Sequence, residues 1–208
     1  KDVGKPGEVL RWTNAQLTKM PFLTSWLDGG QRVGMFHDII MKPINEAFAR
    51  ELEIYEEVGG PINEAIENRS KEDRKRHAKR IFIPEINDHL DGDQVLAVAL
   101  NIGNTSNLEK LLKGEGWVAE DAAAEDISIN NPQLQAVLSH MTRSDWELVN
   151  TIWTQIDKLA PMMAEVHERT SGLKLDKVEP VPFTVQTEDG PMEMRGGYYP
   201  MKYDYLRN

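Results

Sequence analysis

The segment Asp145–Thr170, DWELVNTIWTQIDKLAPMMAEVHERT, decides the fold class, because it is the longest stretch of the chain with a helical period. Its apolar side chains recur at intervals of three and four residues, which places them on one face of an α-helix. That face consists of Leu148, Ile152, Ile156, Leu159, Met163 and Val166, with Trp146, Val149 and Trp153 beside it. The sequence therefore predicts a long helix with a wide buried face, bent at Pro161 and ended by Gly172.

The pattern changes from helical to extended after Gly172. Phe183 and Val185 alternate with polar residues, Asp189-Gly190 is typical of a hairpin turn, and the alternation resumes up to Met194. A small β-hairpin is therefore predicted to follow the helices.

The stretch after this hairpin, Arg195–Asp204 (RGGYYPMKYD), fits neither a helix nor a strand. Gly196 and Gly197 allow backbone angles that other residues avoid, and Pro200 stops any regular ladder. Its aromatic residues are Tyr198, Tyr199 and Tyr203. We expect a rigid, tyrosine-rich chain reversal that is locked onto the helices, and we interpret Gly196-Gly197 as a structural turn instead of a phosphate-binding loop.

Upstream of the long helix, the nearly continuous apolar run Val95–Ile102 predicts the central helix, with Asp93 as its N-cap and Gly103 at its end. Asn104–Asn107 supplies capping residues for a short helix that ends at Gly114.

Two further signals complete this region. Pro132 is typical of a helix start, and Ser144-Asp145-Trp146-Glu147 has the spacing of a capping box for the long helix. The acidic segment Val118–Asp126 fits either a solvated helix or a loop.

The N-terminal part also reads as helical. A short helix is predicted over Glu8–Met20, followed by a turn at Trp26–Gly30. A longer helix is predicted over Gly34–Val58, with a kink or a junction of two helices near Lys42, and Gly59-Gly60-Pro61 is predicted to end it and to start another. The stripe of this longer helix consists of Phe36, Ile40, Ile44, Phe48, Leu52 and Tyr55.

Taken together, these elements predict a mainly α fold: an irregular multi-helix bundle with a small C-terminal β-hairpin and a tyrosine-rich extended segment. Residues 1–172 form the expected helical domain, and residues 173–208 form the hairpin and extended segment packed on it as part of one structural unit.

Composition narrows the protein class. The 208 residues carry a net charge of −10, which on average repels nucleic acid and acidic membranes. The chain contains no cysteine, and no apolar run approaches the roughly 20 residues that span a bilayer. Lys1–Gly7 has no signal-peptide pattern, and its start without methionine suggests a piece of a longer chain. We therefore expect a protein that is neither transmembrane nor secreted by a signal peptide.

One charged segment stands apart from the acidic average. Its cations are Arg69, Lys71, Arg74, Lys75, Arg76, Lys79 and Arg80. Phosphate contacts to nucleic acid are one interpretation, and a solvated helix end or a docking face for the chain's own acidic segments is the other. If the segment binds DNA, glutamates at Arg74, Lys75 and Arg76 should abolish DNA retention and leave the fold intact.

Other candidate chemistry has weaker support. Asp88, His89, Asp91 and Asp93 superficially match a calcium loop, but the closing glutamate is missing, so a turn and an N-cap explain them better. His37-Asp38 and the group Glu165, His167 and Glu168 have no triad or zinc-protease spacing. We therefore predict no catalytic residue, metal or cofactor for this chain.

Three blocks carry a resemblance to a known family: Leu96–Asn104 with Asn107, Leu138–Trp146 leading to Trp153, and Arg169–Gly172 continuing to Arg195–Asp204. Their structural residues are Asn101, Gly103, Asn104, Trp146, Trp153, Gly172, Gly196, Gly197, Tyr198, Tyr199, Pro200, Tyr203 and Asp204. Together the blocks resemble a helical region of the large polyvalent proteins of phages and prophages. These are very large multidomain chains.

The resemblance implies a context more than a reaction. Such chains join enzymatic and non-enzymatic modules and are delivered with phage or plasmid DNA. It therefore implies a non-enzymatic structural or interaction module, virion-associated or in the bacterial host cytoplasm, with other domains of the parent polypeptide as partners and DNA as a second partner. Two alternatives stay open: an accessory nucleic-acid-contacting lobe of a phage polymerase or nuclease, and a self-assembling virion or ejection component. The oligomeric state stays open as well.

Overall fold

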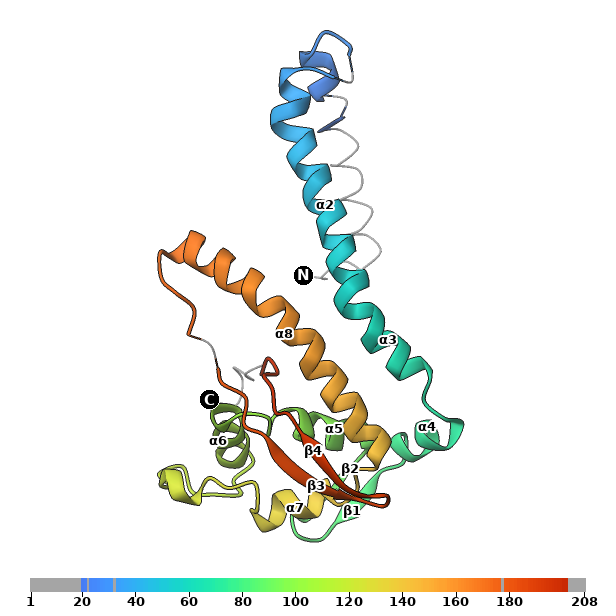
Figure 1. Cartoon of the computed structure of the whole chain (residues 1–208), viewed down its shortest axis with the longest axis vertical. Coiled ribbons are helices and arrows are strands. Elements are labelled where there is room, and N and C mark those ends of the chain that lie inside the picture. Colours follow the sequence, from blue (N-terminus) through green and yellow to red (C-terminus); the bar gives the residue numbers. More distant parts are fainter. Residues whose placement is uncertain (1–19, 22, 32, 177, 202–208) are drawn as a thin grey trace, which may run out of the picture. The chain divides into compact units, whose positions relative to one another are not determined.

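The structure is a computed structural model that describes residues 20–21, 23–31, 33–176 and 178–201. The chain divides into two compact units, Lys1–Glu57 and Val58–Asn208. The C-terminal hairpin belongs to the same unit as the helices from Val58 onward, and the boundary at Glu57 was not predicted from the sequence. The fold is mainly helical with a small C-terminal antiparallel hairpin, as predicted (Figure 1).

In the first unit, residues 23–27 are helical, which the sequence did not predict, and the turn expected at Trp26–Gly30 is confined to residues 28–30. The Asp28 carboxylate accepts hydrogen bonds from the backbone N–H groups of Phe36 and His37, at 3.0 and 2.8 Å. These bonds satisfy two of the free N–H groups at the start of the next helical stretch. The predicted helix at Glu8–Met20 lies outside the described residues except for its end.

A π-helical turn, η1 (His37–Met41), leads directly into α2 (Lys42–Ile54). Pro43 therefore lies in the first turn of α2, where its missing N–H costs little. The junction predicted near Lys42 is present. However, the apolar stripe lies on the surface, since Phe48, Leu52 and Tyr55 are 52%, 60% and 62% exposed.

The helix end predicted at Gly59-Gly60 is wrong. A second π-helical turn, η2 (Tyr55–Gly59), continues into α3 (Gly60–Glu67), and Gly59 keeps right-handed helical angles. Pro61 occupies the first turn of α3, as expected. The glycines therefore carry no C-cap, because a glycine cap would require a left-handed residue there.

The second unit continues with α4 (Lys71–His77) and a hairpin of β1 (Ile81–Ile83) and β2 (Asp88–Leu90). The two strands are antiparallel, with Ile81 opposite Leu90, and this hairpin was not predicted from the sequence. Next comes α5 (Gly92–Leu100), whose N-cap is Asp91 and not Asp93. Asp91 forms a reciprocal capping box with Gln94.

The hydrophobic core lies between α5, α6 (Thr105–Gly114), α7 (Pro132–Leu138) and the first half of α8 (Arg143–Ser171). Its fully buried centre includes Ala99, Leu112, Leu134, Val149 and Trp153, each 0% exposed. The predicted central helix, α5, thus lies in the core. The acidic segment before α7 is mostly loop, with one short 3-10 helix, η3 (Ala124–Asp126).

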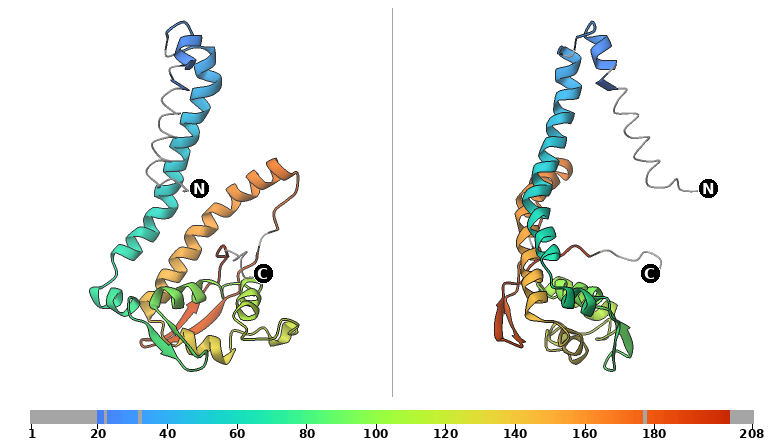
Figure 2. Two further views of the ribbon diagram at one scale, coloured as in Figure 1. Left: turned by 180° about the vertical axis from the view of Figure 1, so that it is seen from behind. Right: turned by 90° about the vertical axis from the view of Figure 1, so that its right-hand side faces the viewer.

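The long helix predicted from the sequence is present as α8, but its capping box lies two residues earlier than predicted. Thr142 is the N-cap and Asp145 is the residue that closes the box, instead of Ser144 and Glu147. The helix changes direction in its C-terminal half, as Pro161 predicts (Figures 1 and 2). Gly172 ends it with a left-handed φ of 72°.

The C-terminal hairpin pairs β3 (Phe183–Thr187) with β4 (Gly190–Met194), as predicted. The right-hand view of Figure 2 shows this hairpin on one side of α8, with α5 and α6 on the other. Phe183 meets the rings of Trp146 and Trp153 edge-on, with centroids 6.1 and 6.2 Å apart. The first half of α8 is therefore covered from both sides.

The segment after β4 docks onto the loop between α5 and α6. The N–H of Gly197 donates to the carbonyl of Gly103 at 2.8 Å, and Asn104 Nδ2 donates to the carbonyl of Gly197 at 3.0 Å. Asn107 Nδ2 donates to the carbonyl of Tyr199 at 2.7 Å. A Cβ on Gly103 would lie 2.6 Å from the Gly197 nitrogen, so the contact requires glycine.

The expected chain reversal is thus present, with Gly196 at φ 70°. Glycines and asparagine amides hold it, while Tyr198 and Tyr199 are only half-buried and Pro200 is exposed. Asn101 joins the same network by accepting a hydrogen bond from Asn107. Tyr203 and Asp204, which we expected to take part, lie outside the described residues.

Candidate functional site

The basic segment is not one continuous helix end. Ser70 starts the separate helix α4 by accepting a hydrogen bond from the N–H of Asp73 at 3.0 Å. Arg69 therefore precedes α4, and Lys79 and Arg80 follow it. The seven cations fall into groups with different surroundings.

Arg69, Arg76 and His77 turn toward one buried carboxylate, that of Asp145 on the first turn of α8. The Asp145 side chain is 0% exposed. Nη2 of Arg69 donates to Oδ1, and Nη2 of Arg76 donates to Oδ2 at 2.6 Å. His77 Nε2 lies 2.7 Å from Oδ1. The N–H and hydroxyl of Thr142 both donate to Oδ2 at 2.9 Å. We call this group the Asp145 cluster.

The Asp145 cluster keeps its carboxylate ionised. Burial raises the pKa of Asp145, but the hydrogen bond from the Thr142 backbone, the one from His77 and the charge of Arg76 outweigh it. The pKa of Asp145 therefore lies below its usual value. A carboxylate can remain charged in the protein interior when arginines neutralise its charge and its oxygens accept hydrogen bonds.

His77 is held on both sides. Its Nδ1 lies 3.1 Å from Oδ1 of Asp93, opposite the contact with Asp145. A Cβ on Gly92 would lie 2.5 Å from the His77 Cα, so only glycine lets α5 start this close to α4. Because each ring nitrogen faces a carboxylate, neither is directed toward a space that a substrate would occupy. The geometry is that of a clamp that joins α4, α5 and α8.

The Asp145 cluster includes residues that the sequence did not single out: His77, Thr142 and Asp145 itself. A signal for Asp145 was present, since Thr142-x-x-Asp145 is also a capping-box spacing. The contacts to Arg69 and Arg76 had no such signal, because they join residues 76 and 69 positions apart.

Two other cations donate to backbone carbonyls. Arg74 donates to the carbonyls of Glu67 and Arg69, at 2.6 and 3.2 Å, and Arg80 donates to the carbonyl of His89 at 2.7 Å. Both side chains are nonetheless exposed, so their charges still contribute to the surface.

The last three cations, Lys71, Lys75 and Lys79, are exposed and recur every fourth residue. That spacing places the first two on one face of α4 and the third just beyond its end. We call these three residues the lysine face. Of the seven predicted contact residues, these three remain with their charged groups directed to solvent, whereas Arg69 and Arg76 hold Asp145.

The structure brings together no group of three or more His, Asp or Glu side chains that could hold a metal, among the residues it describes. Asp88 and His89 lie on strand β2 instead of in a turn. The expected N-cap is present, but Asp91 provides it instead of Asp93. Glu165 and Glu168 are exposed on α8. His37 Nδ1 lies 3.4 Å from the Asp38 carboxylate in the first unit.

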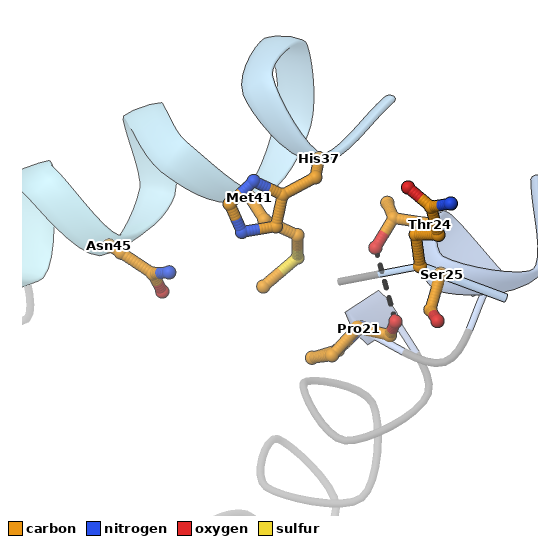
Figure 3. A pocket seen from close by; sticks show the side chains of 7 residues that line it. Pro21, Thr24, Ser25, His37, Met41 and Asn45 are labelled. Atoms are coloured by element: carbon orange, nitrogen blue, oxygen red, sulfur yellow. Dashed lines mark hydrogen bonds between the residues drawn. The ribbon is translucent and has the colours of Figure 1, made fainter. Parts of the chain in front are cut away.

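A cavity of about 480 Å³ lies in the first unit (Figure 3). Figure 3 shows His37, Met41 and Asn45 on one side, with Pro21, Thr24 and Ser25 on the other. Thr24 donates its hydroxyl to the carbonyls of Met20 and Pro21. Of the lining residues that the structure describes, His37 is the one with an ionisable side chain.

A second cavity, of about 440 Å³, lies along the C-terminal half of α8. Its lining residues are Met162, Met163, Val166, His167, Thr170 and Leu175. A third, of about 370 Å³, lies between α7 and β3. Within the described ranges, no helix has the length and apolarity required to cross a membrane.

Comparisons of the chain with protein-family profiles, with curated proteins and with solved structures found no match.

Proposed function

We propose that this chain is a non-enzymatic structural and interaction module of a very large phage- or mobile-element-encoded protein that is delivered with DNA. Its partners are other domains of the parent polypeptide. The observation that carries the interaction role is the surface of α2. This 13-residue helix has no buried residue, and its apolar stripe is exposed at Phe48 and Leu52 and continues to the exposed Tyr55 at the start of η2.

Exposed apolar side chains at helical spacing support this role for a physical reason. Water is an unfavourable environment for a continuous apolar stripe, so covering it releases free energy. Residues at positions i, i+4 and i+7 are the anchors by which an amphipathic helix enters a groove of another domain. Phe48, Leu52 and Tyr55 have this spacing.

The test compares the isolated chain with the same chain in its parent polypeptide, by hydrogen–deuterium exchange of peptides that cover α2. Burial of the stripe predicts slower exchange in the parent. The double variant Phe48→Ser/Leu52→Ser should remove this protection, whereas the control Glu46→Ser/Glu53→Ser, on the opposite face of the helix, should keep it. Equal exchange in the isolated and parent chains would refute the interaction role.

The delivery context has its own test, which is peptide mass spectrometry of purified particles from the source phage or of an induced lysate. Peptides of this chain on a very large packaged polypeptide are the expected result. A stand-alone chain near 23.7 kDa that is absent from particles would contradict the context.

Contact with DNA is the second candidate, and the lysine face favours it. Three exposed lysines on one side of a short helix suit contacts with successive phosphates, and each contact releases counterions. If the module is an accessory lobe of a polymerase or nuclease, this face is where it touches nucleic acid.

The test must avoid the arginines of the Asp145 cluster. Glutamates at Arg74, Lys75 and Arg76 were expected to leave the fold intact, but Arg76 binds the buried Asp145, so that variant would also weaken the fold. The variant Lys71→Gln/Lys75→Gln/Lys79→Gln is the better choice. It should lower DNA affinity at low salt and reduce the slope of log K against log salt by up to about 2.7, at roughly 0.9 per phosphate contact.

A matched control removes three exposed lysines elsewhere: Lys42→Gln/Lys110→Gln/Lys158→Gln. It changes the net charge equally. If both triple variants lose the same affinity, the effect is one of overall charge and the lysine face is not a binding site.

A further inference from the structure

The C-terminal hairpin has one open edge with the properties of a binding site for an extended peptide. In the register of β3 and β4, Gln186 pairs with Pro191 and Thr184 pairs with Glu193. Along an antiparallel ladder, hydrogen-bonded and non-hydrogen-bonded residue pairs alternate. The Gln186–Pro191 pair is not hydrogen-bonded, because Pro191 has no N–H. The Thr184–Glu193 pair lies two positions along the ladder and is therefore not hydrogen-bonded either. The N–H and C=O groups of Thr184 and Gln186 therefore point away from β4.

The two residues that carry these backbone groups, Thr184 and Gln186, line the cavity of about 370 Å³ between α7 and β3. The cavity is lined by three consecutive residues of β3, namely Thr184, Val185 and Gln186. Alternate side chains of a strand point to opposite faces, so three consecutive residues can line one cavity only along the strand's edge. The open edge and the cavity thus form one site.

The wall opposite β3 combines apolar and polar groups. Trp146 and Leu138 supply buried apolar surface, while Asn130, Gln135 and Ser139 supply polar groups. The cavity lies within the range of about 300–1,000 Å³ that is usual for ligand pockets. It suits an apolar side chain whose backbone is held at the strand edge.

The two edges of the hairpin differ in how they resist pairing. Proteins protect exposed strand edges with proline and charged residues. β4 has both at its outward positions, in Pro191 and Glu193, whereas β3 has neither between Phe183 and Thr187. The edge of β3 is therefore left open to an added strand.

Charge indicates what kind of strand it accepts. The exposed carboxylates Glu179 and Glu188 lie before and after β3, and no charged residue lies between them. The chain as a whole carries a net charge of −10, so charge repulsion disfavours a second copy of the chain at this edge. A segment with basic ends and an apolar centre complements the site.

We propose that the open edge of β3 binds an extended peptide segment of another protein as a third, antiparallel or parallel strand. The backbone of the segment pairs with Thr184 and Gln186, a central apolar side chain enters the cavity toward Trp146, and lysine or arginine residues flank it. This site is separate from α2 and from the lysine face, so the proposal does not depend on the function proposed above.

The probe is a library of end-blocked heptapeptides with lysine at both ends and all natural residues at the five central positions, screened on the immobilised chain. Retained peptides should carry apolar or β-branched residues at their centre. In NMR spectra, the strongest binder should shift the amide signals of Thr184 and Gln186, and should slow their hydrogen exchange by tenfold or more.

Gln186→Pro removes the outward N–H of the edge without removing a bond to β4, since Pro191 stands opposite it. It should weaken binding at least tenfold, whereas the control Gln186→Thr, which keeps the N–H, should bind like the native chain. Should Gln186→Pro fail to fold, Ser139→Trp, which fills the cavity from α7, gives the same comparison.

Three results would overturn the proposal. One is a library from which no peptide distinguishes the native chain from Gln186→Pro or Ser139→Trp. Another is amide shifts confined to residues outside β3 and α7. The third combines two observations on the chain without peptide: slow hydrogen exchange of the Thr184 and Gln186 amides, and a dimer mass in sedimentation equilibrium. Together they would mean that a second copy of the chain occupies the edge.

Discussion

At the scale of single residues, Asp145 has the most consequential surroundings in the second unit. One carboxylate receives hydrogen bonds from Arg69, Arg76 and Thr142 and also contacts His77. Asp73, 3.4 Å from Arg76, offsets part of the second arginine charge. Arg69 Nε is buried without a hydrogen-bond partner, so this side chain depends on Asp145 to compensate its burial.

Asp145→Ala should therefore destabilise the chain strongly. Removing one partner of a buried ion pair leaves the other charge uncompensated, which costs about 3–5 kcal/mol. Urea denaturation measures this loss in the free energy of unfolding. The control Glu147→Ala breaks only the exposed pair with Arg143 and should change stability by less than about 1 kcal/mol. Equal effects of the two variants would contradict the role of the Asp145 cluster.

The same carboxylate predicts a pH dependence. Its folded pKa is lowered, so the unfolded chain binds the proton more readily, and the stabilisation is present above the unfolded pKa of about 3.9. It is lost as the pH falls through the folded pKa. The difference in unfolding free energy between the native chain and Asp145→Asn should thus shrink as the pH falls below the unfolded pKa. Asp73, whose pKa is also lowered, is present in both proteins and cancels. A difference that stays constant would show that the Asp145 charge adds nothing.

At the scale of elements, the docking of the C-terminal segment depends on backbone contacts that only glycine allows. Gly103 lies against Gly197, and a Cβ on Gly197 would lie 2.4 Å from the Trp153 ring. Trp153 in turn donates its indole N–H to the carbonyl of Leu100 at 3.1 Å. The end of α5, the middle of α8 and the segment after β4 are thereby fixed together.

Gly103→Ala should break this junction. The added methyl group must displace the backbone of Gly197, so we expect a loss of about 1–3 kcal/mol in the free energy of unfolding, typical of overpacking. The Gly197 amide should also exchange faster with solvent. Gly114→Ala is the matched control, because a Cβ there meets nothing within 4 Å and the residue is helical, so it should be neutral or slightly stabilising. Unchanged stability of Gly103→Ala would show that the segment is not docked.

Helix ends show what the sequence can and cannot predict. Gly172 was identified correctly as the left-handed cap of α8, and a Cβ there would meet nothing within 4 Å. Thr142-x-x-Asp145 and Ser144-x-x-Glu147 fit the same capping pattern, and the choice between them depends on Arg69 and Arg76, which are distant in sequence. The periodicity of apolar residues therefore predicted the helices and the hairpin. The partners of the basic residues could be identified only from the three-dimensional fold.

At the scale of the whole molecule, the hydrophobic core belongs to one unit. Its buried members extend from Ile83 to Met194, and the half-buried residues packed against them begin at Ile62. Among the described residues of the first unit, none is a member of this core. α2 instead exposes its apolar stripe, which fits a chain in which one unit supplies stability and the other supplies a surface.

A fragment of residues 58–208 should accordingly fold without the first unit. Because its removal takes away no member of the core, the free energy of unfolding should stay within about 0.5 kcal/mol of the value for the same transition in the whole chain. Urea denaturation followed by the fluorescence of the buried residues Trp146 and Trp153 measures it, and amide NMR spectra of the two proteins should superimpose for α5–α8. Asp145→Ala should destabilise the fragment as much as the whole chain, since every partner of Asp145 lies within it. A fragment that unfolds without cooperativity would show that residues 1–57 are required for the core.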